Sequence, residues 1–262
     1  MTTSLEHGIG EARGAAADGE VVVVMSGDGL IGQIGGALVE TGAPLGVIPG
    51  GRGNDFARVL GIPTEIPDAV ALIANGAMRK IDVGEVNGRR FLCVASCGFD
   101  SDVNRIANET RLVKGNLVYL YAALRGLAAW KPAHFEVTLD GRRESLTGFS
   151  VAAANNRAYG GGMYLAPDAE LDDGLLDVVT TGDVSKLRCL VNLPTVFSGR
   201  HVEKDEVTVE RASEVEITAD RPFAVYADGD HLADLPAQIR VLPCALDVIA
   251  PPGCDLVGPR RR

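Results

Sequence analysis

Hydrophobic and polar residues alternate in two different ways along the chain, and the first part has the pattern of an α/β domain. Residues 21–25 form a continuous apolar run, which predicts a strand buried on both faces of a parallel sheet. Apolar residues then recur at helical spacing from 30 to 38. We expect helices over 4–18, 30–38, 55–60 and 66–75 and strands over 21–25 and 43–48.

From about residue 80 the pattern is typical of β structure. Asn87 and Gly88 are a strong turn signal between alternating runs at 80–86 and 89–95, which predicts a hairpin. Two apolar stretches predict helices within this part, and we interpret the first as core rather than as a lipid-facing surface. The helices are expected over 117–130 and 186–197, and further strands over 133–139, 144–154, 175–181, 207–210, 214–219, 223–227, 237–242 and 246–249.

The change of pattern predicts two domains. Residues 1–83 are expected to form an α/β domain, residues 84–250 a larger antiparallel β domain, and residues 251–262 a tail. The chain opens on a helix, whereas a βα unit normally opens on its strand. We therefore expect the first domain to lack its first strand.

The composition argues against several classes of protein. Of the 262 residues, 46% are hydrophobic and 23% are charged, which is enough for the core of one large or two smaller domains. The formal net charge of -10 argues against nucleic-acid binding and provides no long-range attraction to anionic membranes. No apolar run approaches the roughly 18 residues of a membrane span, and the N-terminus has no signal-peptide pattern.

The cysteines are interpreted as core residues. The chain has five cysteines without a C-x-x-C spacing and four scattered histidines, which argues against zinc and disulfides and favours a reducing cytoplasm. Cys93 and Cys97 lie four residues apart in an expected strand. Both should therefore face the same side of the core.

Residues 26–32, SGDGLIG, form a glycine turn between the first strand and the following helix. Gly27 and Gly29 allow a tight turn with exposed N–H groups at a helix N-terminus, which suits a phosphate. The Asp28 carboxylate would repel a phosphate unless it caps N–H groups or acts with a divalent cation. Gly27, Gly29 and Gly32 also fit G-x-G-x-x-G, but the acidic residue expected about twenty positions later in a dinucleotide-binding domain is missing.

A second glycine turn, PGGRGND at 49–55, follows the second strand. The carboxyl ends of parallel strands lie at one edge of a sheet, so the two turns should converge. Arg52 is then expected to meet phosphate. Asn54 and Asp55 are either nucleotide contacts or the N-cap of the next helix.

Two acidic clusters in the second part are candidates for metal binding or catalysis. Asp168, Asp172 and Asp173 crowd a turn in PDAELDDGLL, which is either a site for a hard cation or a solvated turn. In YADGD, at 226–230, two carboxylates flank a glycine at the end of a strand. They are either functional acids or residues of a hairpin turn.

Four motifs together resemble the bacterial diacylglycerol kinase-like lipid kinases, relatives of sphingosine and ceramide kinases. The motifs are SGDGLIG from Ser26, PGGRGNDFAR from Pro49, ELDDGLLDV from Glu170 and ADGD from Ala227. They have the family's order and spacing over about residues 4–250. The resemblance implies a Rossmann-like α/β nucleotide domain, a larger antiparallel β-sandwich-like domain and an active site in the cleft between them.

The resemblance also implies the site of an ATP- and Mg²⁺-dependent kinase. Asp230 would accept the proton of a lipid hydroxyl, and Asp28 is the second expected catalytic carboxylate. A structural magnesium would bind Asp173, helped by the backbone carbonyls of Glu170 and Leu175. The expected nucleotide contacts are Ser26, Gly27, Asp28, Gly29, Leu30, Ile31, Gly32, Arg52, Asn54 and Asp55.

The chain departs from the family pattern at defined positions. Ser26 replaces a glycine, Leu30 and Arg52 replace threonines, and Asp230 replaces a glutamate. Aspartate is shorter by one bond, about 1.5 Å, which can misplace a base unless the backbone compensates. The family's opening strand and N-P-x-x-G loop have no counterpart here, which would weaken nucleotide binding.

We therefore expect a cytoplasmic kinase that uses ATP and Mg²⁺ to phosphorylate a diacylglycerol-like lipid at the membrane surface, in phospholipid metabolism. The oligomeric state stays open, a homodimer included. One alternative is an NAD kinase, for whose Asn-Glu motif only Asn108 and Glu109 are available. Others are an NADP oxidoreductase, with Arg52 on the 2′-phosphate, and a non-catalytic nucleotide- or lipid-binding relative.

Overall fold

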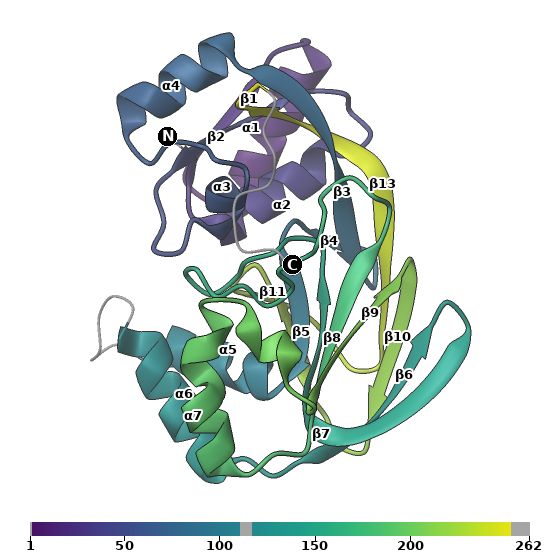
Figure 1. The fold of residues 1–262 in the computed structure, drawn as a ribbon. Helices are drawn as coiled ribbons and strands as arrows, with labels where there is room; N and C mark the ends of the chain where they lie inside the picture. The colour runs from purple at the N-terminus through teal and green to yellow at the C-terminus, as the bar shows by residue number, and fades with distance from the viewer. Residues whose placement is uncertain (1, 111–116, 253–262) are drawn as a thin grey trace.

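The chain forms two lobes that are joined by long strands (Figure 1). The computed structural model describes residues 2–110 and 117–252, so the expected tail lies almost wholly outside the described residues. The upper lobe contains two short parallel strands with helices around them, and the lower lobe contains a large, mainly antiparallel sheet with helices beside it. The expected combination of an α/β part and a larger β part is confirmed.

The upper lobe follows the predicted alternation of helices and strands closely. Its elements are α1 (Leu5–Ala17), β1 (Val22–Ser26), α2 (Asp28–Leu38), β2 (Leu45–Pro49), α3 (Asp55–Val59) and α4 (Ile66–Asn75). β1 and β2 are parallel, with Val24 opposite Val47. β2 is buried along its whole length, as its unbroken apolar run predicts.

Strand β1 is buried on only one face, so the expectation of burial on both faces is wrong. Val22 and Val24 are buried against α1 and α2, whereas Val23 and Met25 are 47% and 58% exposed. β1 ends the described sheet on this side. A run of valines cannot show which face stays uncovered, because the covering residues come from other segments.

The lower lobe is built from antiparallel strands and three helices. Its elements are β3 (Ala77–Val86), β4 (Arg89–Phe91), β5 (Val94–Gly98), α5 (Phe99–Glu109), α6 (Leu117–Ala129), β6 (Ala133–Leu139), β7 (Arg142–Ala154), β8 (Leu176–Gly182), α7 (Lys186–Val196), the 3-10 helix η1 (Arg200–Glu203), β9 (Val207–Ala212), β10 (Glu214–Ala219), β11 (Ala224–Ala227), β12 (Asp230–Asp234) and β13 (Ala237–Ala250). The sequence pattern did not predict α5 or β12, because polar residues dominate both segments.

Strand β13 extends through both lobes. Two strands were expected at 237–242 and 246–249, but the structure has one, with an irregularity between Leu242 and Leu246. β13 pairs with β10 in the lower lobe and, at Val248, with β2 in the upper lobe. With β3 as its antiparallel partner, it forms the connection between the lobes (Figure 1).

Cys93 and Cys97 belong to different hydrophobic cores, so the expectation that they share one face is wrong. Cys93 belongs to the core cluster that fills the upper lobe and the adjoining part of the lower lobe. Cys97 belongs to the core cluster of the lower lobe. The expected strand over 89–95 is interrupted at Leu92 and Cys93, where backbone N–H groups bond to a carboxylate instead of to a neighbouring strand. This interruption turns the chain between the two cores.

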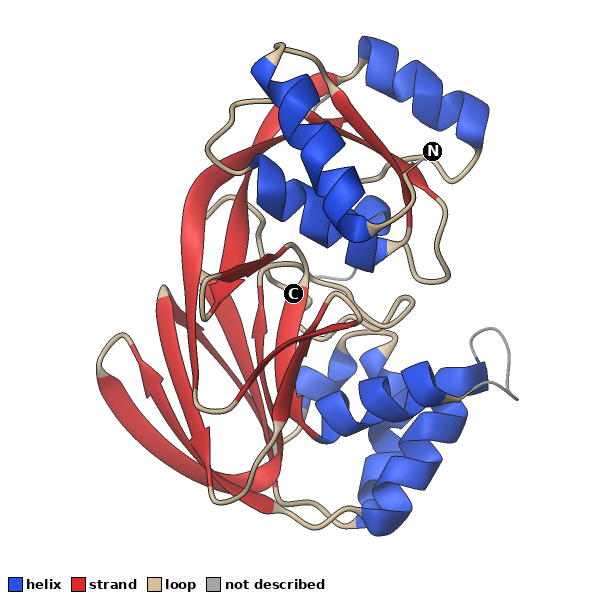
Figure 2. Ribbon diagram, turned by 180° about the vertical axis from the view of Figure 1, so that it is seen from behind, coloured by secondary structure: helices blue, strands red, loops and turns tan. Residues whose placement is uncertain are grey.

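Helices α5, α6 and α7 gather on one side of the lower sheet (Figure 2). In α6, Val118 and Ala122 are buried against α5, while Tyr121 and Leu124 are exposed. The helix expected as core is therefore core on one face only. Within the described ranges, no helix is long and apolar enough to cross a membrane.

Candidate active site

The two glycine turns touch each other, as the parallel strands predict. Gly50 donates its N–H to the carbonyl of Ser26 at 2.8 Å. A Cβ added at Gly27 would lie 3.1 Å from the Cα of Gly51, and one added at Gly51 would clash with the Gly27 backbone. Both positions therefore require glycine for this close approach.

The second turn is closed by Asn54. Its Oδ1 accepts from the N–H of Gly51 at 2.8 Å, and its Nδ2 donates to the Gly51 carbonyl at 3.1 Å. Asn54 has a positive φ of 52°, a conformation that asparagine tolerates better than most residues. Arg52, at the tip of this turn, is exposed.

Asp28 caps helix α3 rather than its own helix. Its Oδ1 accepts from the N–H of Phe56 at 3.0 Å, which ties the two glycine turns together. Asn54 stands at the N-cap position of α3, as one alternative expected, but neither Asn54 nor Asp55 caps the helix with its side chain. No side chain caps α2, which begins at Asp28. Its first N–H groups therefore have no side-chain acceptor at the first glycine turn.

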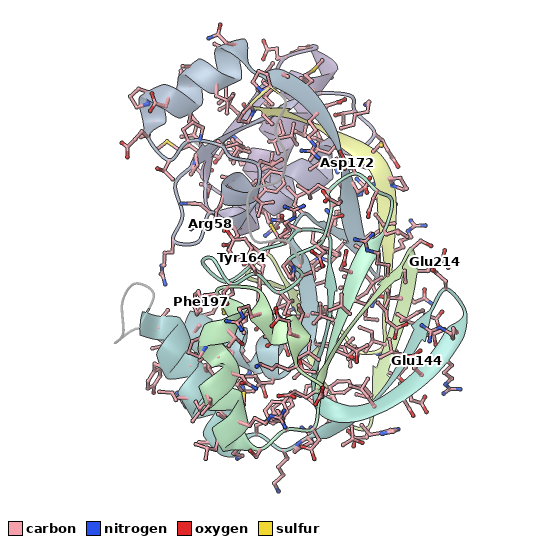
Figure 3. All side chains as sticks on the ribbon, viewed as in Figure 1. Arg58, Glu144, Tyr164, Asp172, Phe197 and Glu214 are labelled. Carbon is pink, nitrogen blue, oxygen red and sulfur yellow. The ribbon has the colours of Figure 1, made fainter. Side chains whose placement is uncertain are left out.

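Asp55 links the two lobes. Its carboxylate accepts from the N–H groups of Gly161 and Gly162, both at 2.7 Å, although it is 3% exposed. Gly162 also lies close to Arg58, which Figure 3 shows on the same side of the molecule as Tyr164. Burial raises the pKa of Asp55 to about 6 against the opposing effect of the two donors.

Asp228 is held by the interrupted strand. It has a positive φ of 53°, and its two carboxylate oxygens accept from the N–H groups of Leu92 at 2.7 Å and Cys93 at 2.9 Å. Removal from water raises its pKa to about 7 despite these donors, with the Asp28 charge adding to the rise. Gly32 of α2 leaves the space that the carboxylate fills, since a Cβ there would clash with Oδ2.

Asp230, the expected base, lies against the first turn of α2. Its Oδ2 accepts from Nε2 of Gln33 at 2.8 Å, and a Cβ added at Gly29 would lie 2.7 Å from the same oxygen. Asn108 donates to the carbonyl of Gly229 at 3.0 Å, so α5 supports this turn from its other side. The late acidic motif therefore meets the first glycine turn.

One cavity lies where these segments meet. Three carboxylates line it, those of Asp28, Asp55 and Asp228, together with Gly53, Cys93, Val94, Ser96, Asn104, Tyr159, Gly160, Gly161, Tyr226 and Gly229. Asp230 is not among the residues that line it, although its neighbour Gly229 is. Ile31, an expected nucleotide contact, is buried in the hydrophobic core. Sequence reasoning did not predict that Tyr159, Gly160 and Gly161 line this cavity. The run of three glycines after Tyr159 was a visible signal of a glycine turn.

The acidic turn at 168–173 does not line this cavity, and it does not bring its three aspartates together. Asp172, labelled in Figure 3, forms an ion pair with Arg79 of β3 at 2.8 Å. Oδ1 of Asp173 accepts from the N–H of Leu175 at 3.0 Å, and its Oδ2 lies 3.6 Å from Arg211. The Glu170 side chain pairs with the buried Arg157.

Hydrogen bonds from backbone N–H groups hold the acidic turn from below. Asp82, beneath the turn, accepts from the N–H groups of Gly174 and Cys244, both at 2.7 Å, and burial raises its pKa, with Asp173 adding to the rise. In the described part of the chain, no three His, Cys, Asp or Glu side chains are arranged to hold a metal ion. The oxygen donors fit a hard cation chemically, but a cation at Asp173 would have to displace Arg211.

The buried carboxylates give a pH-dependent stability. The pKa values of Asp55 and Asp228, about 6 and about 7 in the folded chain, lie above the unfolded value of about 3.9. Their stabilising contribution is therefore complete below about pH 4 and is lost as the pH rises through 6 and 7. We expect a higher thermal midpoint at pH 5.5 than at pH 7.5, and Asp55→Asn should reduce the difference, whereas the exposed Asp234→Asn should not. A midpoint that is equal or lower at pH 5.5 would contradict this prediction.

Comparisons with known proteins agree with the motifs. Residues 1–86 match the diacylglycerol kinase catalytic domain, and residues 93–250 match the YegS C-terminal NAD kinase beta sandwich-like domain. A protein named diacylglycerol kinase from Mycobacterium tuberculosis (strain ATCC 25618 / H37Rv) is 41% identical over 88% of this chain and 77% of its own length. A probable lipid kinase YegS-like from Yersinia enterocolitica is 33% identical over 91% of this chain and 81% of its own length.

The solved structures support the fold. A putative diacylglycerol kinase from Bacillus anthracis str. Sterne superposes with a TM-score of 0.80 over 97% of this chain and 86% of that chain, at 24% identity. A second structure, also of a putative diacylglycerol kinase from Bacillus anthracis str. Sterne, has a TM-score of 0.78 over 96% of this chain and 84% of that chain, at 23% identity. At such identities the likeness shows the two-lobed fold alone.

Proposed function

Because the chain belongs to the diacylglycerol kinase family, we propose that it is a lipid kinase that transfers the γ-phosphoryl group of ATP, with Mg²⁺, to the hydroxyl of a diacylglycerol-like lipid. The observation that carries the proposal is the meeting of the two glycine turns with the Asp228–Asp230 turn. The relatives named diacylglycerol kinase and probable lipid kinase support the lipid as acceptor.

The nucleotide phosphates are assigned to the two turns. The N–H groups at the start of α2 and the exposed Arg52 side chain offer donors and positive charge at the point where Gly27 meets Gly51. Asp28 keeps the turns together through Phe56. Bound Mg²⁺ would neutralise the charge of the triphosphate, and without it the carboxylates of this cavity would repel the phosphates.

The acceptor hydroxyl is assigned to Asp230. A carboxylate within hydrogen-bond reach of the hydroxyl can take its proton as the phosphoryl group is transferred. Gln33 orients this carboxylate, and Asp228, fixed by Leu92 and Cys93, sets the position of the turn. This support offsets the shorter side chain of aspartate relative to the family's glutamate.

A structural magnesium at Asp173 is part of the proposal. Glu170 and Leu175 would add backbone carbonyls, and Asp82 holds the turn through Gly174. The site is separate from the cavity that receives the phosphates. Its role would be to order the connection between β3 and β8, because Asp82 lies on the first of these strands and the turn leads into the second.

The test is a transfer assay with radiolabelled ATP against diacylglycerol, a sphingoid base, ceramide and NAD. We expect label in the diacylglycerol product only, and loss of the signal when EDTA removes Mg²⁺. Label in NAD would replace the proposal by the NAD kinase alternative. Binding of ATP without transfer to any acceptor would leave a non-catalytic relative.

A further inference from the structure

A cleft of about 520 Å³ is formed by helix α5, the end of helix α6 and the segment between β10 and β11. We call it the basic cleft, because four of its side chains are cationic. None of the described residues lines both the basic cleft and the cavity of the candidate active site. Helix α5 contributes to both, with Asn104 at the active-site cavity and Arg105 at the cleft. The basic cleft is therefore a separate site on a shared helix.

The charges in the basic cleft are unbalanced. Its cations are Arg105, Arg125, Lys131 and Arg221, and its one carboxylate is Asp102, which pairs with Arg105 at 3.2 Å. Within the described ranges, the other three cations have no ion-pair partner. The whole chain carries a formal net charge of -10, so these cations are concentrated against the overall charge. A cleft lined by charges of one sign attracts ions of the other sign, here anions.

Trp130 adds a buried hydrogen-bond donor to the wall of the cleft. The residue is 4% exposed, and its Nε1–H has no acceptor among the described residues. A buried indole N–H usually has an acceptor, and one without an acceptor destabilises the fold. Nε1 is itself covered, so an anion reaches it only after a shift of lining side chains. Those of Arg125 and Lys131 are exposed and without a partner, so such a shift breaks no described ion pair.

Arg221 is held in place before any ligand arrives. Its guanidinium group lies over the rings of Trp130 and Phe223, at 5.3 Å and 5.0 Å from their centroids. It also donates to the carbonyl of Pro132 at 3.3 Å and to the carbonyl of Lys131. These acceptors are neutral, so the positive charge of Arg221 stays uncompensated. A fixed guanidinium group with further N–H donors suits the oxygens of a phosphate.

We propose that the basic cleft binds a phosphate group, with Arg125, Lys131 and Arg221 as its cationic ligands and the Nε1–H of Trp130 as a neutral donor. Such a group is carried by free phosphate and by the head groups of anionic phospholipids, and both present the same oxygens. The inference does not depend on the proposed kinase function, because the cleft shares no described residue with the active-site cavity.

The first test uses Trp130 as the reporter, because it is the only tryptophan in the chain. Titration with inorganic phosphate, at an ionic strength held constant with sodium chloride, should change its fluorescence and reach saturation. Arg125→Gln should weaken phosphate binding at least about ten-fold, the effect of losing one charge-assisted hydrogen bond. Arg13→Gln is the matched control, since Arg13 is an exposed arginine on a helix of the other lobe, and it should leave the midpoint unchanged. Equal midpoints in Arg125→Gln and the unchanged chain would overturn the proposal.

The second test distinguishes the two sources of phosphate. Vesicles of phosphatidylglycerol should sediment the protein and change the Trp130 fluorescence if the ligand is a head group, and Arg125→Gln should reduce both effects. Vesicles of zwitterionic phosphatidylcholine should have neither effect. A response to inorganic phosphate together with no response to phosphatidylglycerol assigns the site to a free phosphate. The proposal fails if neither probe gives a response that depends on Arg125.

Discussion

Replacing Asp230 with asparagine is expected to lower kcat for lipid phosphorylation by about 10²- to 10⁴-fold, the usual contribution of a general base. Asparagine has nearly the same shape, and its Oδ1 can still accept from Gln33, which now bonds to Oδ2 at 2.8 Å. It cannot take a proton from the acceptor hydroxyl. The turn should therefore keep its structure while the transfer step slows.

Initial rates with radiolabelled ATP and diacylglycerol measure the effect, and thermal unfolding checks the fold. Asp234→Asn is the matched control, because it makes the same change at the other end of β12, where the Asp234 side chain is exposed and pairs with His231. We expect this control to keep its full rate. If Asp230→Asn retains more than about a tenth of the original kcat, Asp230 is not the base.

Gly51→Ala is expected to separate the two glycine turns and to weaken binding of ATP by at least about ten-fold. The added Cβ would occupy the space of the Gly27 backbone and approach Oδ1 of Asn54 to 3.1 Å, so the second turn must shift as a unit. Such overpacking typically costs about 1–3 kcal/mol of stability. The N–H groups of the turns would then no longer converge on one phosphate.

Titration of a fluorescent ATP analogue and thermal unfolding test this prediction together. Gly14→Ala, in α1, is the control, because nothing lies within 4 Å of a Cβ at that position and alanine favours a helix interior by about 0.5–1 kcal/mol. It should leave nucleotide affinity unchanged and raise the midpoint slightly. Nucleotide affinity in Gly51→Ala equal to that of the unchanged chain would show that the contact between the turns does not form the phosphate site.

The sequence by itself determined the local features of the site. Strand, glycine turn and helix follow one another in both phosphate turns, and their periodicities are local properties of a few neighbouring residues. The rule that parallel strands end at one edge was sufficient to predict that Gly27 and Gly51 meet, and they do. The order of four motifs was sufficient to identify the family.

Only the tertiary structure decided which carboxylates share the cavity and how they are held. Asp55 bonds a turn 106 residues away, and Asp228 bonds N–H groups 135 and 136 residues away. The exposed face of β1 and the continuity of β13 depend in the same way on distant segments. Periodicity predicts which way a residue faces within its own element. It does not predict which distant segment will cover that residue or form a hydrogen bond with it.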